Sequence, residues 1–422
     1  MNNMHDTEEK KERVILVGVM TKQDEDTEES LNELKELGKT AGIVTVGMVI
    51  QRLENQNPAT YIGKGKIEEV RLLAQEHEAD CVVCDDELSP AQLANLQDAL
   101  QLKVIDRTIL ILDIFAQHAT SREGKIQVEL AQLRYRATRL VGMRQSLSRL
   151  GGGIGTRGPG EKKLEMDRRF IKERISQLKK ELEQVKRSRE VARKQRAKSP
   201  IPVVAIVGYT NAGKSTLLNR LTDAGVLEEN QLFATLDPTT RKRKLESGQE
   251  ILLTDTVGFI RKLPHHLIEA FRSTLEEATY ADVILHVTDA SNPCADTHMY
   301  VVYQTLRDLD VSGKPIITVF NKIDAREMVP EEKRIALVDH QADEVVCISA
   351  KNGEGTDHLL HVIEDILQQQ KCLMEERFPY DQAGKIQLIR KYGQIIEEDY
   401  REDGIFVRAF LPMDLYHIIH QE

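Results

Sequence analysis

The sequence predicts an α/β fold in which a mostly parallel sheet carries helices on both faces. Before it we expect a small α/β subdomain and a long antiparallel helical hairpin, and after it a small α+β module. Strand-like apolar runs alternate with helical patterns in two separate stretches, and a basic segment with heptad spacing lies between them. At about 150 residues per domain, 422 residues suffice for roughly three domains. The expected parts are 1–120, 121–198, 199–370 and 371–422.

The composition is that of a folded protein. Hydrophobic residues make up 41% of the chain and charged residues 30%, which excludes a disordered protein. No apolar run approaches the roughly 18 residues that a membrane-spanning helix needs, and residues 1–10 are too polar for a signal peptide. Five cysteines, an odd number, do not suggest a set of disulfides. We therefore expect a cytoplasmic protein that is not inserted in a membrane.

Residues 13–118 alternate between strand-like and helical patterns, which predicts a small parallel sheet. The strand-like runs are Val14–Met20, Ile43–Ile50, Cys81–Cys84 and Val104–Ile105, and the helical patterns are Leu31–Leu37, Ile67–Leu73 and Ala91–Leu100. Cys81 and Cys84 stand in one strand, where side chains three positions apart face opposite sides. We therefore expect core cysteines there rather than a metal site.

Residues 121–197 are predicted to form two long helices joined by the glycine-rich segment 151–160. Apolar residues recur along each helix at steps of four and three, interrupted by Arg144 on the first helix and by Arg168 on the second. This is the seam expected for an antiparallel pair roughly 45–55 Å long. The seam residues are Ile126, Leu130, Leu133, Ala137, Leu140 and Leu147, and then Leu164, Ile171, Ile175, Leu178, Leu182 and Val185.

The same segment carries a localised positive charge. Residues 121–198 contain 23 Lys and Arg against 9 Asp and Glu, a net charge of +14, whereas the whole chain carries −10. A basic segment in an acidic protein indicates contact with a polyanion, and RNA suits a basic rod with a glycine-rich tip. The alternative is a plain coiled-coil spacer with a solvated charged face. We favour RNA contact.

A phosphate-binding loop follows the buried-strand pattern at 203–207. Residues 208–215 are Gly-Tyr-Thr-Asn-Ala-Gly-Lys-Ser, and a helical pattern comes directly behind them. The glycines allow backbone N–H groups to surround phosphates, and the helix N-terminus adds a favourable partial charge. We expect Lys214 to reach the β- and γ-phosphates and Ser215 to bind Mg²⁺.

Two later motifs indicate that the nucleotide base is guanine. A buried-strand pattern ends in Asn321-Lys322-Ile323-Asp324. The Asp324 carboxylate can accept hydrogen bonds from the ring N–H and the exocyclic amine of guanine, a pair of donors that adenine does not offer. Asn321 would support the loop, and the stem of Lys322 would pack on the ring. After a further strand, Ser-Ala-Lys at 349–351 resembles the motif whose backbone approaches the guanine carbonyl oxygen.

Two segments are expected to sense the γ-phosphate. Residues 255–258, Asp-Thr-Val-Gly, resemble the GTPase motif that places an Asp near Mg²⁺ and a Gly N–H on the γ-phosphate. Upstream, residues 233–238 lie where a switch loop belongs, and Thr235 is the expected second Mg²⁺ hydroxyl. Thr235 as a plain turn residue, with Thr239 or Thr240 as the ligand, is the alternative.

Two further positions concern the rate of hydrolysis. Many GTPases have a glutamine directly after Asp-x-x-Gly to orient the attacking water, and this chain has Phe259. We therefore expect slow intrinsic hydrolysis that a partner stimulates. Asn211 resembles the residue that holds K⁺ in some GTPases, and a loop-stabilising asparagine is an equal alternative.

The predicted site comprises the following residues. Catalytic roles are expected for Lys214, Thr235 and Gly258. The expected Mg²⁺ ligands are Ser215, Thr235 and, through water, Asp255, with Asn211 as the K⁺ candidate. The expected GTP-binding residues are Gly208, Tyr209, Thr210, Asn211, Ala212, Gly213, Lys214, Ser215, Thr216, Phe233, Ala234, Thr235, Asp255, Thr256, Val257, Gly258, Asn321, Lys322, Asp324, Ser349, Ala350 and Lys351.

The order of these parts resembles the HflX family of ribosome-associated GTPases. The resemblance rests on the glycine-rich loop running into Glu-Lys-Lys-Leu-Glu at 161–165, on the basic hairpin and on the GTPase motifs behind it. It implies a protein that binds GTP or GDP and the RNA of the large ribosomal subunit. It also implies splitting of stalled or idle ribosomes under heat or other stress, with GTP hydrolysis releasing the protein. The implied RNA contacts are Arg149, Arg157, Lys162 and Lys163.

Two other functions stay open on the sequence. One is a GTPase of tRNA modification or subunit assembly, since Asn211 is shared with such proteins. The other is a non-enzymatic RNA-binding adaptor with a nucleotide-gated arm. We expect no DNA partner and a monomer; a weakly membrane-associated fraction and ATP binding by the N-terminal part are left open.

Overall fold

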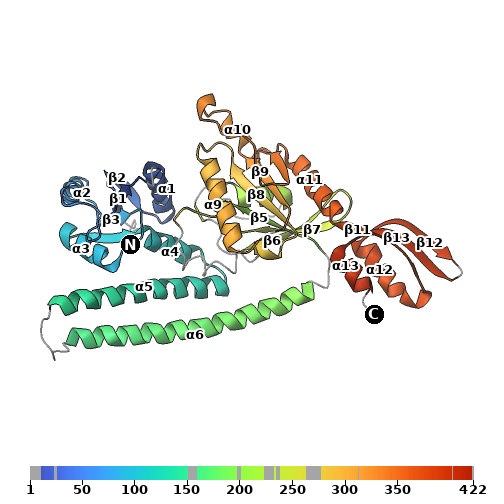
Figure 1. Cartoon of the computed structure of the whole chain (residues 1–422), viewed down its shortest axis with the longest axis horizontal. Coiled ribbons are helices and arrows are strands. Elements are labelled where there is room, and N and C mark those ends of the chain that lie inside the picture. The colour runs from blue at the N-terminus through green and yellow to red at the C-terminus, as the bar shows by residue number, and fades with distance from the viewer. Residues whose placement is uncertain are drawn as a thin grey trace, which may run out of the picture. The chain divides into compact units, whose positions relative to one another are not determined.

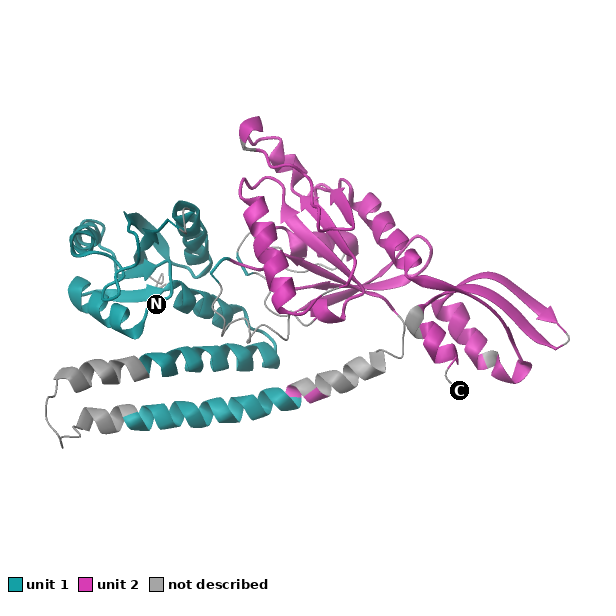
Figure 2. Cartoon of the chain, in the orientation of Figure 1, with its two compact units in different colours: residues 1–184, 230–236, 261–271 teal, residues 185–229, 237–260, 272–422 magenta. Residues whose placement is uncertain are grey.

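The computed structural model describes residues 11–22, 26–150, 159–196, 201–222, 232–233, 238–262, 277–311, 313–401 and 403–420. The chain forms two compact units (Figures 1 and 2). Unit 1 contains residues 1–184, 230–236 and 261–271, and unit 2 contains residues 185–229, 237–260 and 272–422. The four-part division expected from the sequence stays a prediction.

Unit 1 contains a four-stranded parallel sheet in the order β2-β1-β3-β4. Residues 14–19 of β1 and all of β3 are buried, as the alternation of strands and helices predicts. Ser89 and Gln92 cap the third helix reciprocally, which explains why that helix begins directly after Ser89. The elements are β1 (Arg13–Met20), α1 (Thr27–Thr40), β2 (Val44–Arg52), α2 (Lys64–Glu76), β3 (Cys81–Cys84), α3 (Pro90–Leu100), β4 (Lys103–Asp106) and α4 (Arg107–His118).

Two long helices follow, α5 (Arg122–Leu150) and α6 (Pro159–Arg196). At 1.5 Å per residue, their 29 and 38 residues span about 44 and 57 Å. Ile126 and Leu178, two of the expected seam residues, are buried. The middle of α5 is joined to the sheet because Tyr135 and Arg139 both donate to the buried carboxylate of Asp106 at the end of β4.

Unit 2 contains a six-stranded sheet in the order β10-β9-β8-β5-β7-β6, parallel except for β6. Helices α7 and α11 share one apolar cluster with Val319, whereas α9 packs with the neighbouring Phe320, so helices cover both faces. The elements are β5 (Val203–Gly208), α7 (Lys214–Thr222), β6 (Thr239–Lys244), β7 (Glu250–Asp255), β8 (Val283–Asp289), α9 (Ala295–Asp308), β9 (Ile316–Asn321), α10 (Ile323–Arg326), η1 (Glu331–Lys333), β10 (Glu344–Cys347) and α11 (Thr356–Gln369).

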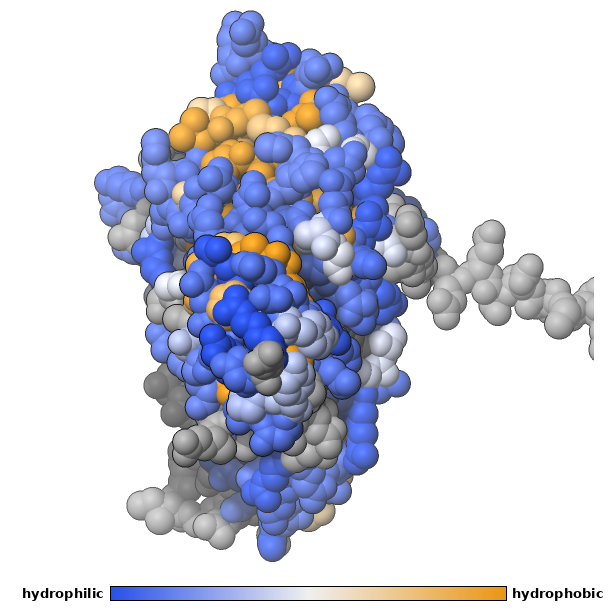
Figure 3. Space-filling model, turned by 90° about the vertical axis from the view of Figure 1, so that its right-hand side faces the viewer, coloured by the Kyte–Doolittle hydropathy of each residue, from blue (hydrophilic) through white to orange (hydrophobic). Residues whose placement is uncertain are grey.

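The end of unit 2 is a small α+β module with an antiparallel sheet in the order β11-β13-β12. One apolar cluster of its own joins the sheet to the two helices. The face of the chain in Figure 3 is largely hydrophilic and carries an apolar patch near the top of the view. Its elements are β11 (Lys371–Phe378), η2 (Tyr380–Gln382), α12 (Ala383–Tyr392), β12 (Gln394–Arg401), β13 (Gly404–Pro412) and α13 (Met413–His420). Among the described residues, no helix combines the length and apolarity needed to cross a membrane.

Candidate functional site

The phosphate-binding loop connects β5 to α7 at the carboxyl edge of the unit 2 sheet. Its backbone makes a left-handed turn at Asn211, with φ +59°, and again at Gly213, with φ +93°. A Cβ at Gly213 would lie 2.3 Å from Nδ2 of Asn321, so only glycine fits there. The loop therefore adopts the tight path that brings backbone N–H groups to the start of α7.

Lys214 lies at the N-terminus of α7 and is almost fully buried. Its Nζ donates a hydrogen bond to the Tyr209 carbonyl at 2.8 Å. Burial lowers the pKa of Lys214 to about 8, although the charge of Asp255 acts in the opposite direction. A phosphate group beside this ammonium would stabilise its charged form, which suits a residue that binds β- and γ-phosphates.

Ser215 and Asp255 form the candidate magnesium site. The Ser215 hydroxyl donates to Oδ2 of Asp255 at 2.7 Å, and Asp255 is fully buried at the end of β7. A hydroxyl and a carboxylate held side by side supply the oxygen donors that Mg²⁺ prefers, so the residues fit this cofactor. When bound, Mg²⁺ supplies positive charge that stabilises the β- and γ-phosphate oxygens during hydrolysis.

Gly258 and Phe259 lie directly on the phosphate-binding loop. The Thr210 N–H donates to the Phe259 carbonyl at 2.7 Å, and the Phe259 N–H donates to the Gly208 carbonyl at 3.1 Å. A Cβ on Gly258 would lie 2.7 Å from Cα of Thr210 and 3.0 Å from Nζ of Lys214. The glycine is therefore required by this close approach, and its backbone lies beside the phosphate-binding lysine. The side chain of Phe259 is buried.

The guanine motifs meet at the carboxyl ends of β9 and β10. Asn321 bridges them to the phosphate loop, because its amide donates to the Ala212 carbonyl and its Oδ1 accepts from the Ala350 N–H, both at 2.9 Å. Asp324, the expected guanine reader, accepts a hydrogen bond from the Ser349 hydroxyl at 2.7 Å. Hydrogen bonds thus connect three motifs that lie far apart in the sequence.

Lys322 is held by two partners. Its ammonium lies 2.8 Å from the Asn211 carbonyl and 2.8 Å from the Asp289 carboxylate. Sequence analysis missed Asp289, although its position at the carboxyl end of β8 was a usable signal, because ligand sites of parallel sheets gather at that edge. It also missed His298, whose ring stacks on Tyr209 at 3.7 Å between ring centroids.

Other predicted residues belong to unit 1 or lie outside the described residues. Phe233 belongs to unit 1, where its ring packs on Phe115. Ala234, Thr235 and Arg157 lie outside the described residues, as do the side chains of Arg149, Lys162 and Lys163. The roles expected for these residues stay predictions.

The fold and the site define a P-loop GTPase: a mostly parallel sheet, a Lys-Ser phosphate loop, and an Asn-Lys-x-Asp motif at the carboxyl end of β9. Sequence models of three families match the chain. These are "GTP-binding GTPase N-terminal" over residues 28–116, "GTP-binding GTPase Middle Region" over 118–196, and "50S ribosome-binding GTPase" over 203–322.

Curated relatives identify the family. The chain is 64% identical over 416 residues to a GTPase HflX of Lacrimispora saccharolytica, which covers 99% of this chain and 97% of the relative. It is 42% identical over 400 residues to GTPase HflX of Escherichia coli K12, covering 95% and 93%. The chain therefore belongs to the HflX family of GTPases and is a GTP-hydrolysing enzyme, with the Mg²⁺ dependence of its class.

A solved structure also resembles the chain. It is a GTP-binding protein from the archaeon Sulfolobus solfataricus in complex with GDP, 27% identical. The similarity covers 85% of this chain and 99% of that one, with a TM-score of 0.43.

Proposed function

We propose that this GTPase binds the large ribosomal subunit and dissociates stalled or idle ribosomes under heat or other stress, with GTP hydrolysis releasing it. The observation that carries the proposal is the net charge of +14 on residues 121–198 within an acidic chain. Phosphate contacts dominate the affinity of proteins for RNA, so a charge of this size on a long hairpin favours a ribosomal RNA partner.

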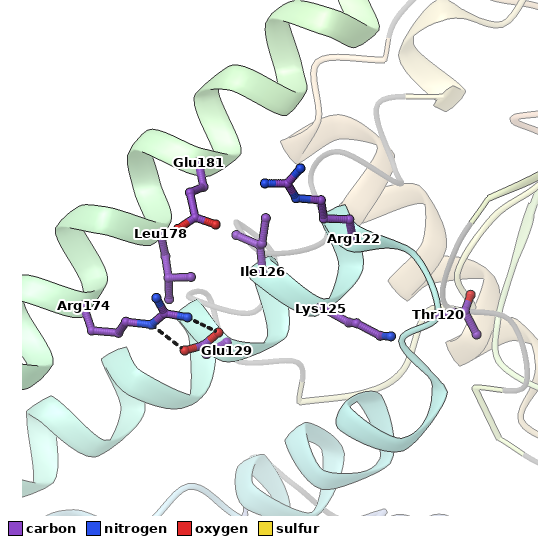
Figure 4. A pocket seen from close by; sticks show the side chains of 8 residues that line it. All are labelled: Thr120, Arg122, Lys125, Ile126, Glu129, Arg174, Leu178 and Glu181. Carbon is purple, nitrogen blue, oxygen red and sulfur yellow. Dashed lines mark hydrogen bonds and ion pairs between the residues drawn. The ribbon is translucent and has the colours of Figure 1, made fainter.

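The described part of the hairpin presents several cations to solvent. Arg169, Lys172, Lys179 and Lys180 are exposed along α6. Near the base of the hairpin, a pocket of about 360 Å³ is lined by Arg122, Lys125 and Arg174, with Glu129 and Glu181 beside them (Figure 4).

Arg174 on α6 donates through two nitrogens to the two carboxylate oxygens of Glu129 on α5, at 2.8 and 3.0 Å. A bidentate pair of this kind orients both helices against each other. It supports a hairpin that stays extended while its exposed lysines contact RNA.

The experiment measures GTP hydrolysis with and without purified large subunits at two salt concentrations. We expect strong stimulation that falls as salt rises, because counterion release drives the contact. A variant with Lys179→Glu and Lys180→Glu should lose most of the stimulation and keep its intrinsic rate.

The matched control carries the same charge change on α2, at the exposed Lys64 and Arg71. Small subunits serve as the second control. Equal rates with and without large subunits would contradict the proposal and favour a tRNA-modification GTPase. Light scattering of whole ribosomes then separates splitting from subunit assembly.

A further inference from the structure

A histidine outside the sequence motifs covers the first side chain of the phosphate loop. The imidazole of His298 lies face to face with the phenol ring of Tyr209, with 3.7 Å between the ring centroids and 6° between the ring planes. Tyr209 is buried and His298 is partly exposed, so the imidazole is one of the groups that exclude water from the tyrosine ring. Both residues belong to unit 2.

The backbone of Tyr209 lies where two parts of the phosphate site meet. Its carbonyl accepts the hydrogen bond from Nζ of Lys214, and a parallel bridge pairs it with Phe259. Gly258, which directly precedes Phe259, is the residue expected to contact the γ-phosphate. A side chain in a staggered rotamer is joined to its backbone in a defined direction, so a ring that cannot move also restrains its own peptide. The place of the Tyr209 carbonyl therefore depends on what holds the ring.

His298 has a firmly held backbone near the start of α9. Its N–H donates to the Cys294 carbonyl at 3.0 Å. Ala295 before it and Met299 after it are buried, and both belong to the apolar cluster that packs α9 with Phe320 of β9. Because the helix is packed against the sheet on both sides of His298, the imidazole can hold the tyrosine ring in one place.

The connection that leads into α9 is joined to the guanine motif. The Ala290 N–H donates to the Asn321 carbonyl at 2.8 Å. One carboxylate oxygen of Asp289 accepts from the Ser291 N–H at 2.9 Å, and the other accepts from Lys322 at 2.8 Å. The start of α9 is thus fixed to the strand end that carries the guanine motif. The imidazole therefore links the tyrosine of the phosphate loop to the base-binding side of the site.

The two ends of the phosphate loop are held by different groups. Near α7, the Asn321 amide donates to the Ala212 carbonyl. At the β5 end, the stack on His298 holds Tyr209. The end near α7 supplies the N–H groups of the helix N-terminus, which suit the phosphates that GTP and GDP share. The β5 end adjoins Gly258, so its position matters for the γ-phosphate, which GDP lacks.

We propose that His298 is a positioning residue for GTP hydrolysis, which acts through the ring of Tyr209 and keeps the segment at Gly258 in place for the γ-phosphate. A group that is fixed before the substrate arrives need not be ordered in the transition state, and stacked rings stabilise each other beyond their burial. Loss of the imidazole lowers the rate of hydrolysis and leaves GDP binding unchanged. The inference needs only the GTPase activity of the family and is independent of the ribosomal proposal.

The test measures single-turnover hydrolysis of saturating GTP by the full chain without ribosomes. His298→Ala removes the stack, and we expect the rate constant to fall roughly 3- to 10-fold, the range expected for one aromatic pair. Affinity for GDP should stay at the parent value. His298→Phe keeps a ring on Tyr209 and should restore most of the parent rate. Tyr300→Ala, which removes an exposed ring from the same helix, is the matched control and should hydrolyse GTP like the parent.

Further variants separate positioning from a loss of stability. His298→Gln fills similar space without a ring and should act like His298→Ala. In a Tyr209→Leu background the stack is already absent, so His298→Ala should not lower the rate further. Thermal unfolding shows whether each variant is folded. Folded His298→Ala and His298→Gln proteins with the parent rate would overturn the proposal. Equal losses of GTP and GDP affinity, no recovery in His298→Phe, or additive effects with Tyr209→Leu would also overturn it.

Discussion

Asp289 at the end of β8 forms an ion pair with Lys322 of the guanine motif, with 2.8 Å between the carboxylate oxygen and the ammonium. Lys322 has a left-handed φ of +64°, so the pair and the hydrogen bond to Asn211 both hold an unfavourable backbone in place. The stem of the lysine is thereby fixed at the place where the base is expected to stack.

We expect Asp289→Ala to weaken GTP and GDP binding about 5-fold each, close to 1 kcal/mol, because the pair is partly exposed and its free energy is modest. Titration with a fluorescent guanine nucleotide measures both affinities. Asp296→Ala, at an exposed residue in the first turn of α9, serves as the control. Unchanged affinity in Asp289→Ala would mean that the ion pair does not support the base site.

Asp324→Asn should change the base that the enzyme prefers. A carboxylate accepts from two donors of guanine, whereas an amide can donate to the 2-carbonyl of xanthine. We expect GTP affinity to fall at least about 100-fold and xanthosine triphosphate to bind more tightly than GTP. Competition between the two nucleotides measures the reversal. If the variant still preferred GTP, Asp324 would not be the residue that reads the base.

Sequence patterns predicted the elements whose local signal is strong. The strand at Cys81–Cys84 was placed with its observed bounds, because four apolar or sulfur-bearing residues in a row are typical of a strand buried on both faces. Strand β6, Thr239–Lys244, was missed because its residues Thr-Thr-Arg-Lys-Arg-Lys carry no apolar pattern. It is an antiparallel edge strand that pairs with β7 and presents charged side chains to solvent.

The contacts of the site and its surroundings also divide into those with a strong local sequence signal and those without one. The phosphate loop and the guanine motifs were predictable because their chemistry requires particular residues at short, regular spacing. The ion pair of Lys262 with Asp85 and the ring contact of Phe233 with Phe115 could not be predicted from the sequence. Each contact joins residues more than 100 positions apart, and neither belongs to a repeated pattern. Only the fold brings such residues together.

Asn211 offers a test of the potassium hypothesis. Its left-handed backbone and the hydrogen bond from Lys322 to its carbonyl fix the loop, and its side chain is exposed. If the side-chain oxygen binds K⁺ beside the phosphates, hydrolysis should be roughly 10-fold faster in K⁺ than in Na⁺ at equal ionic strength. Asn211→Ala should remove this difference. Equal rates in both salts for the parent enzyme would leave Asn211 as a loop-stabilising residue.

His286 makes the stability of the protein dependent on pH. It is fully buried on β8 beside the ring of Tyr303, and burial lowers its pKa to about 4. The unfolded chain, with a histidine pKa near 6.5, binds more protons than the folded chain between about pH 6.5 and 4. The contribution of His286 to the free energy of unfolding is therefore complete above pH 6.5 and decreases by about 3 kcal/mol as the pH falls to 4.

Denaturant titrations across this pH range test the role of His286. The free energy of unfolding should fall less steeply with decreasing pH in His286→Asn than in the parent protein. His361→Asn, at an exposed histidine, should follow the parent, and parallel curves for all three proteins would rule out His286 as the source.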